Sequence, residues 1–210
     1  MEQYYNEGNR LVKNNQIDKA QEYFEKSCNL GYAEACMVRG YSNVKNYEVE
    51  LKYYKRACEL KLAKGCFFVW QKAYPKGKKA EAFSYLQKAY EIEKSYGVLL
   101  SGAYKDGRGT KKDLTKAREL LEEACENGDG NGCWGLGEMY FNGESVAKDT
   151  AKAEMYFDKA CEFEKDLGIS IGSFFKKRND IARAKKYFKI ACGNNETMWN
   201  WTCKANWNIK

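Results

Sequence analysis

The amino-acid sequence predicts an all-α protein, an α/α solenoid with a right-handed superhelix of about six helix pairs. Three observations support this prediction. A block of nine residues recurs six times, each copy has the apolar spacing of an α-helix, and almost no segment alternates in the manner of a β-strand. Helix pairs repeated at this period bury their apolar faces against their neighbours and so stack into a solenoid.

The recurring block predicts the second helix of each pair. The ends of successive blocks are separated by 30, 32, 35, 36 and 31 residues. The apolar or small positions of a block fall at i, i+3, i+4, i+7 and i+8, which places them on one helical face. The six copies are AQEYFEKSC (residues 20–28), ELKYYKRAC (50–58), AFSYLQKAY (82–90), ARELLEEAC (117–125), AEMYFDKAC (153–161) and AKKYFKIAC (184–192).

A second helical pattern lies between the blocks and predicts the first helix of each pair. It is clearest in residues 132–143, where Cys133, Leu136 and Tyr140 share a face. A glycine inside a helix costs about 1 kcal/mol relative to alanine, so a small residue that returns at one register predicts a close helix crossing. The positions four residues after the repeat cysteine are Gly40, Gly102, Gly137 and Ser173, with Trp70 as the exception.

No linker rich in Pro, Gly or Ser divides the chain. We therefore expect one continuous solenoid domain over residues 1–192, followed by a C-terminal cap over residues 193–210. The longest apolar runs, such as residues 65–70, are far shorter than the roughly 18 residues of a membrane span. We expect no membrane span and a monomeric protein.

The chain has no histidine, which excludes several kinds of catalytic and metal site. Without imidazole there is no Ser-His-Asp or Cys-His nucleophile system and no HExxH zinc site. Phosphate-cradling motifs are also absent. We therefore predict no cofactor and no metal.

Six of the nine cysteines follow the repeat in pairs that are eight residues apart, namely Cys28 with Cys36, Cys58 with Cys66, and Cys125 with Cys133. The third copy ends in Tyr90 and Val98 follows eight residues later, so both partners are absent together. This joint presence and absence favours disulfide bonds over the two alternatives, reduced buried thiols and zinc coordination. Each bridge closes a loop of nine residues, which contributes about 2.6 kcal/mol in the chain-entropy model.

The other three cysteines depart from this spacing. Cys192 and Cys203 are eleven residues apart, and we expect them to form a further bridge. The fifth copy keeps Cys161 but has Ile169 at its partner position. Because nine is an odd number, at least one thiol stays unpaired, and we expect Cys161 to be buried and inert rather than a nucleophile.

The run ACENGDGNGCWGLGEMYFNGESVAKDTAKAEMYFDKAC (residues 124–161) resembles the Sel1-like repeat in its disulfide-bridged form, as in the Helicobacter cysteine-rich proteins. The resemblance covers nearly the whole chain, although repeats 1, 3 and 6 have a spacing more like that of tetratricopeptide repeats. It implies a scaffold that binds peptides or proteins and is periplasmic or secreted. The N-terminal sequence MEQYYNEGNR lacks an export leader, and a cytoplasmic location is the alternative if the cysteines are reduced.

A solenoid of this kind presents a concave groove lined by the first helix of each pair. With Cys133, Leu136 and Tyr140 toward the core, the groove side of that helix carries Asn131, Trp134, Glu138 and Phe141. The same offsets in other copies give Glu34, Met37, Tyr41, Lys64, Phe67, Gln71, Ser170, Phe174 and Lys177. Aromatic residues carry interface energy, so we expect a protein or peptide ligand with Trp134 as its main anchor. For Phe67 and Phe174, packing in the core is the alternative.

The resemblance also implies an enzymatic alternative, because some members of the family are described as penicillin-binding or as weak β-lactamases. Three SxxK matches exist, Ser42 with Lys45, Ser145 with Lys148 and Ser173 with Lys176. Neither SDN nor KTG occurs to complete the penicillin-recognising set. We therefore expect no catalytic residues.

The net charge of +7 is concentrated at the C-terminal end. Residues 171–210 contain nine Lys and Arg against Asp180 and Glu196. Such an end can steer an acidic partner, and a solvated helix face is the alternative. We expect no nucleic-acid binding, because nucleic-acid binders usually show a basic stripe along the fold.

Overall fold

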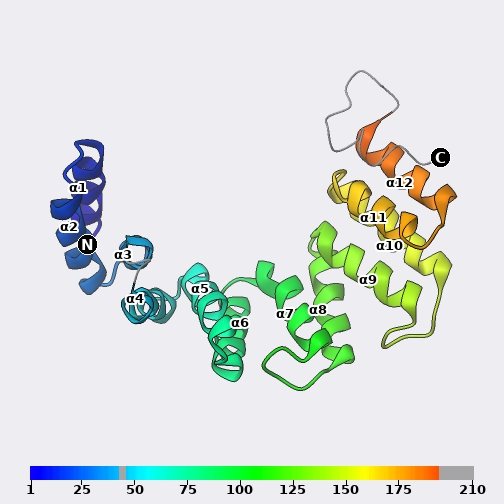
Figure 1. Cartoon of the computed structure of the whole chain (residues 1–210), viewed down its shortest axis with the longest axis horizontal. Helices are drawn as coiled ribbons and strands as arrows, with labels where there is room; N and C mark the ends of the chain where they lie inside the picture. The colour runs from blue at the N-terminus through cyan, green and yellow to red at the C-terminus, as the bar shows by residue number, and fades with distance from the viewer. Residues whose placement is uncertain (43–45, 194–210) are drawn as a thin grey trace. The chain divides into compact units, whose positions relative to one another are not determined.

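The segments expected to be helical are helical in the structure, a computed structural model that describes residues 1–42 and 46–193. Within these residues it contains twelve α-helices, the short 3₁₀ turns η1 (Tyr74–Lys76) and η2 (Lys94–Tyr96), and no β-strand (Figure 1). The predicted all-α class is confirmed. None of the described helices is long and apolar enough to cross a membrane.

The chain forms two compact units, and the boundary lies in the loop between α7 and α8. The first unit, Met1–Lys112, contains α1 (Glu2–Lys13), α2 (Ile17–Asn29), α3 (Ala33–Ser42), α4 (Tyr47–Glu59), α5 (Ala63–Ala73), α6 (Lys79–Ile92) and α7 (Gly97–Asp106). The second begins at Asp113 and contains α8 (Leu114–Glu126), α9 (Gly130–Asn142), α10 (Thr150–Phe163), α11 (Leu167–Lys176) and α12 (Ile181–Cys192). One continuous domain over residues 1–192 stays a prediction, and the expected cap lies outside the described residues apart from Gly193.

Five of the six helix pairs that the repeat predicts pack within the two units. In the first unit α1 packs on α2, α3 on α4 and α5 on α6, and in the second α9 packs on α10 and α11 on α12. The second helix of each pair buries the face given by its nine-residue block. In α10, for example, Ala153, Phe157 and Ala160 are fully buried.

A glycine of the first helix lies against an aromatic ring of the second helix in several pairs. A Cβ atom added to Gly137 of α9 would lie 2.5 Å from the ring of Phe157, and one added to Gly172 of α11 would lie 2.6 Å from the ring of Phe188. The sequence spacing predicted Ser173 as the small position of this last pair. The structure has Gly172 there instead. The reason is that Gly172 lies eleven residues after Cys161, whereas Gly40 and Gly137 lie twelve residues after Cys28 and Cys125.

Asparagine and aspartate side chains fix where several second helices begin. Asp113, Asp149 and Asp180 each accept a hydrogen bond from the backbone N–H three residues later, at 3.0, 2.9 and 3.1 Å, and Asn46 does the same at 3.2 Å. Each such cap contributes about 1 kcal/mol to its helix. Gly143 ends α9 with a φ of 73°, a left-handed conformation that favours glycine.

Three disulfide bonds join the end of one helix pair to the start of the next. Their Cα–Cα distances are 4.8, 4.6 and 4.6 Å. They link α2 to α3, α4 to α5 and α8 to α9, and they are the three pairs that the eight-residue spacing predicts: Cys28–Cys36, Cys58–Cys66 and Cys125–Cys133. Cys192 is disulfide-bonded as well, and its expected partner Cys203 lies outside the described residues.

Cys161 is a free and buried thiol, as expected. Burial, together with the nearby charge of Asp158, raises the pKa of this thiol to about 11. Since Gly172 replaces Ser173 at the small position, the residue that corresponds to the missing cysteine is Gly168 rather than Ile169. Gly168 has no side chain, and a Cβ added there would lie 2.6 Å from the carbonyl oxygen of Tyr187.

Candidate partner-binding groove

The second unit has a hollow of about 450 Å³ between α9 and α11, both of which are first helices of their pairs. We call it the α9–α11 hollow. It is lined by Trp134, Glu138, Ile169, Ser170, Ser173, Phe174, Lys177 and Arg178. The sequence predicted Trp134, Glu138, Ser170, Phe174 and Lys177 on the groove side, so the structure brings these five together.

The α9 wall follows from the amphipathic pattern of that helix. Cys133, Leu136 and Met139 are at most 1% exposed and hold α9 in the core. Trp134 and Glu138 are four residues apart, so they lie one above the other on another face of the same helix. Both are half-buried. The packing of the opposite face therefore holds these two side chains in place.

Part of the Trp134 side chain is buried within the protein. Its Nε1 atom is buried and has no hydrogen-bond partner among the described residues. An indole N–H donor without a partner carries a desolvation cost. The rest of the ring lines the hollow, where it offers apolar surface to a ligand.

The α11 wall combines hydroxyl groups with cations. Ile171 and Phe175 are fully buried and anchor the helix. Ser170 and Ser173 lie one turn apart on the side of the hollow, and Lys177 follows at the end of the helix.

Arg178 is held against the wall by two contacts. Its guanidinium lies 3.5 Å from the centre of the Phe174 ring, and its Nη1 donates a hydrogen bond to the Phe174 carbonyl oxygen at 3.1 Å. A cation stacked on an aromatic ring in this way has a restricted orientation.

Phe174 and Phe141 act mainly as packing residues. Phe174 is only 7% exposed, and the Phe141 ring centre lies 5.2 Å from that of Phe174 and 5.5 Å from that of Phe175. Core packing, the alternative for Phe174, is what the structure shows, although its edge reaches the hollow. Asn131 is exposed at the start of α9, outside the residues that line the hollow.

The groove residues predicted in the first unit have mixed environments. Met37 is only 5% exposed and belongs to the core, in contrast to the prediction, because its flexible side chain bends into the cluster around Tyr54. Tyr41 is 42% exposed and packs its edge on Phe68 at 5.1 Å. Phe67 is half-buried against Trp70 and Tyr96. The polar side chains predicted at this surface, Glu34, Lys64 and Gln71, are exposed.

Sequence reasoning missed Ile169, Ser173 and Arg178 as residues of the hollow. The shift at Gly172 explains the first two, because a one-residue change in register rotates the whole helix by about 100°. The sequence signal for this register was Gly172, which lies shortly before Phe174 and Phe175, together with Phe188 in the next block. Arg178 lies after the end of α11, where helical periodicity predicts nothing.

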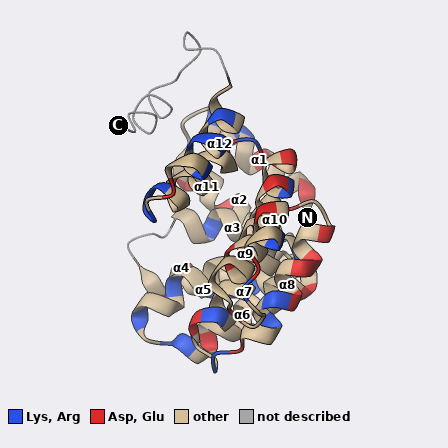
Figure 2. Ribbon diagram, turned by 90° about the vertical axis from the view of Figure 1, so that its right-hand side faces the viewer, with Lys and Arg blue, Asp and Glu red and all other residues tan. Residues whose placement is uncertain are grey.

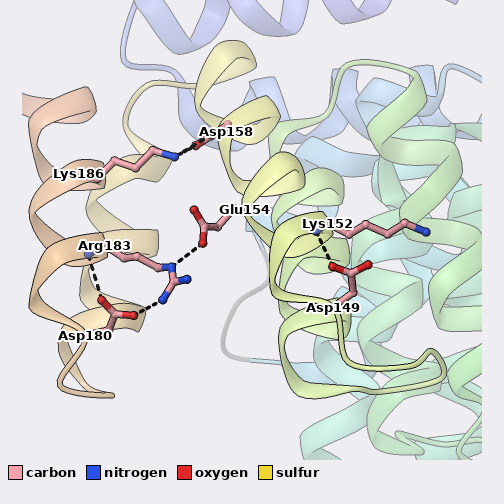
Figure 3. Close-up of polar contacts among 7 residues, drawn as sticks. All are labelled: Asp149, Lys152, Glu154, Asp158, Asp180, Arg183 and Lys186. Atoms are coloured by element: carbon pink, nitrogen blue, oxygen red, sulfur yellow. Dashed lines mark hydrogen bonds and ion pairs between the residues drawn. The ribbon is translucent and has the colours of Figure 1, made fainter.

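The basic C-terminal end is partly neutralised by α10. Figure 2 shows Lys and Arg gathered along α12. Figure 3 shows Arg183 between two carboxylates, with Nε 2.6 Å from Glu154 and Nη1 2.5 Å from Asp180, while Lys186 lies 2.7 Å from Asp158. Hydrogen bonds from the Arg183 side chain and backbone hold the pKa of Asp180 below its ordinary value.

The serine motifs considered for acyl transfer lie in unrelated settings. The Ser42 hydroxyl donates to the Val38 carbonyl oxygen at 2.8 Å, and Lys148 lies 5.5 Å from the centre of the Phe141 ring. Ser145 is exposed in the loop between α9 and α10 with a φ of 64°. Within the described part of the chain, no three His, Cys, Asp or Glu side chains are placed to bind a metal ion.

Two solved structures show the same fold as this chain. A Sel1 repeat protein from Oxalobacter formigenes superposes with a TM-score of 0.73 at 19% identity, covering 91% of this chain and 87% of that one. A protective antigen of uropathogenic Escherichia coli strains, which displays an SLR fold, superposes with a TM-score of 0.70 at 18% identity, covering 90% of this chain and 44% of that one. No curated protein matches the sequence.

The Sel1 repeat model matches six segments that together span most of the chain: residues 3–32, 51–62, 75–92, 98–129, 130–162 and 166–195. The helix pairs and the two solved structures place the fold in the α/α solenoid class. The three bridges across eight residues fit the cysteine-rich type of this repeat. By its repeats and by its fold, the chain belongs to the Sel1 repeat family.

Proposed function

We propose that this protein is a non-enzymatic binding scaffold that holds an extended segment of a protein or peptide partner in the α9–α11 hollow. Sel1 repeat proteins generally mediate protein–protein interactions. For this chain the proposal is carried by the hollow itself, where Trp134, two hydroxyl groups and two cations meet between two first helices. Pockets that combine apolar rings with a few placed polar groups are typical of ligand sites.

The two walls would contribute in different ways. Burying the exposed part of Trp134 removes apolar surface from water, which supplies affinity. The hydroxyl groups of Ser170 and Ser173 and the cations beside them would fix the orientation of the bound segment through hydrogen bonds. Because α9 and α11 are held by buried side chains, little conformational entropy is lost when a ligand binds.

We also propose that the protein works in the periplasm or outside the cell. Three disulfide bonds are compatible with an oxidising compartment, where such bonds form and persist. In a reducing cytoplasm the same six cysteines would be thiols.

The test is a selection of displayed random peptides on the purified protein, followed by affinity measurements on the enriched sequences. We expect Trp134→Ala to weaken binding by about 2 kcal/mol, or roughly 30-fold, as for a central aromatic anchor. Trp134→Phe should keep most of the affinity, because the ring remains and the buried Nε1 has no hydrogen bond to lose in the free protein.

Phe163→Ala is the matched control, since this aromatic residue of α10 is 45% exposed and lies outside the hollow. It should leave binding unchanged, and thermal unfolding of all three variants reports on the fold. Selected peptides that bind Trp134→Ala as tightly as the unaltered protein would show that the hollow is not the binding site.

A further inference from the structure

We infer that the α9–α11 hollow selects a partner segment that is acidic. The inference rests on the proposed binding function and adds the chemistry of the ligand. Among the residues that line the hollow are two cations, Lys177 and Arg178, and one carboxylate, Glu138. Glu138 already interacts with another residue of the protein. Two cations against one carboxylate leave a net positive charge at this surface.

Two cations of α12 are balanced by carboxylates within the protein. Arg183 pairs with Glu154 at 2.6 Å, and Lys186 pairs with Asp158 at 2.7 Å (Figure 3). Lys177 and Arg178 have no carboxylate partner among the described residues. Cations kept without a partner beside a hollow offer charge complementarity to an anionic ligand.

The hydrogen-bonding groups at this end of the hollow are donors. A guanidinium has five N–H donors, and the hydrogen bond to the Phe174 carbonyl oxygen uses only one of them in Arg178. The stacking on Phe174 restricts the orientation of this group before any ligand arrives. Ser170 and Ser173 add two hydroxyl groups on the same helical face. An ionised carboxylate, which only accepts hydrogen bonds, is the complement of this set.

The hollow also has an apolar part, formed by Trp134 of α9 and Ile169 of α11. A segment that fits both parts carries an apolar side chain next to a glutamate or aspartate. The basic residues of α12 belong to the same unit and would attract such a segment from a distance.

The experiment measures fluorescence anisotropy of three labelled synthetic peptides of equal length, in which leucine alternates with glutamate, glutamine or lysine. We expect the glutamate peptide to bind about tenfold more tightly than the glutamine peptide and the lysine peptide to bind most weakly. Added salt should reduce the advantage of glutamate, because exposed charges are screened. Lys177→Gln combined with Arg178→Gln should abolish that advantage.

Lys13→Gln combined with Lys19→Gln is the matched control, because it removes the same net charge from exposed side chains of α1 and α2. It should leave the advantage of glutamate intact. Lys177→Gln alone changes one exposed side chain, so we expect a smaller loss of the same kind without any effect on folding.

The two proposals fail in different ways. If the glutamate and glutamine peptides bind equally and Trp134→Ala weakens both, the acidic preference is wrong while the binding scaffold stands. If none of the peptides binds, both proposals are overturned. A single-stranded oligothymidylate that displaces the glutamate peptide at lower concentration than the unlabelled peptide does would overturn the inference in favour of a nucleic acid.

Discussion

Gly137 and Gly172 show how a single residue sets the distance between two helices. Each lies under the ring of a buried phenylalanine, so the space that a Cβ atom would need is already filled. The helices can therefore approach closely, and the cost of a glycine within a helix is offset by packing on the ring.

We predict that Gly137→Ala lowers the free energy of unfolding by about 1–2 kcal/mol, because overpacking exceeds the gain in helix propensity. Gly102 of α7 is the control, since a Cβ atom added there meets nothing within 4 Å. Gly102→Ala should be neutral or stabilising by up to about 1 kcal/mol. Urea unfolding of the two variants checks the difference, and equal effects would contradict the packing argument.

At the scale of the element, the disulfide bonds connect helix pairs that are otherwise joined by short turns. Each bridge joins the end of one helix to the start of the next. The turn between α6 and α7 lacks this bridge, and the boundary between the two compact units follows in the next loop.

We expect Cys125→Ala combined with Cys133→Ala to cost about 2.6 kcal/mol of stability, the chain-entropy value for a loop of nine residues. Differential scanning calorimetry measures the change. Alkylation of the denatured, unreduced protein followed by peptide mapping should leave all six bridged cysteines unlabelled. If these six cysteines were labelled, both the bridges and the proposed location outside the cytoplasm would be wrong.

The start of α12 depends on pH through Asp180, whose pKa is lowered by hydrogen bonds from Arg183. A carboxyl group with a depressed pKa stabilises the fold above its unfolded pKa of about 3.9, and this contribution is lost as the pH falls through the lower folded value. We predict that Asp180→Asn destabilises the protein at pH 7 and has little effect near pH 2.

The control for this prediction is Asp166→Asn, because Asp166 precedes α11 without a capping hydrogen bond from its side chain. The measurement is the urea midpoint of unfolding of both variants and of the unaltered protein at neutral and acidic pH. A difference between Asp180→Asn and the unaltered protein that is the same at both pH values would refute the assignment.

At the scale of the whole molecule, the net charge of +7 is a means of steering partners. We predict that Lys185→Glu combined with Lys189→Glu, both on exposed side chains of α12, slows association with an acidic peptide several-fold and weakens its salt dependence. The dissociation rate should not change. Stopped-flow measurements separate the two rates, and a change confined to dissociation would place these lysines in direct contact with the ligand.

The helix pairs were predictable from the sequence because the packing that stabilises them is local and repeated. The blocks around Phe157 and Phe188 carry the same spacing, and the eight-residue cysteine pairs mark the turns. The residues that line the hollow were harder to predict from the sequence. Met37 and Trp134 occupy the same position after their cysteines, yet one is buried and the other lines the hollow, because burial depends on neighbours that the repeat does not specify. The spacing from Cys161 to Gly172, one residue shorter than in the bridged copies, also displaced the prediction for α11.

The glycine at position 168 has a consequence for the way in which this protein acquires its disulfide bonds. It leaves Cys161 as a thiol in a chain whose other cysteines must pair correctly. A thiolate attacks disulfides and exchanges partners with them. In the unfolded chain Cys161 can therefore enter wrong pairings, whereas in the native state its burial and raised pKa withdraw it from exchange. Correct pairing then depends on α10 packing before the disulfide bonds form, because this packing buries Cys161. The order of folding is thereby linked to the pattern of disulfide bonds.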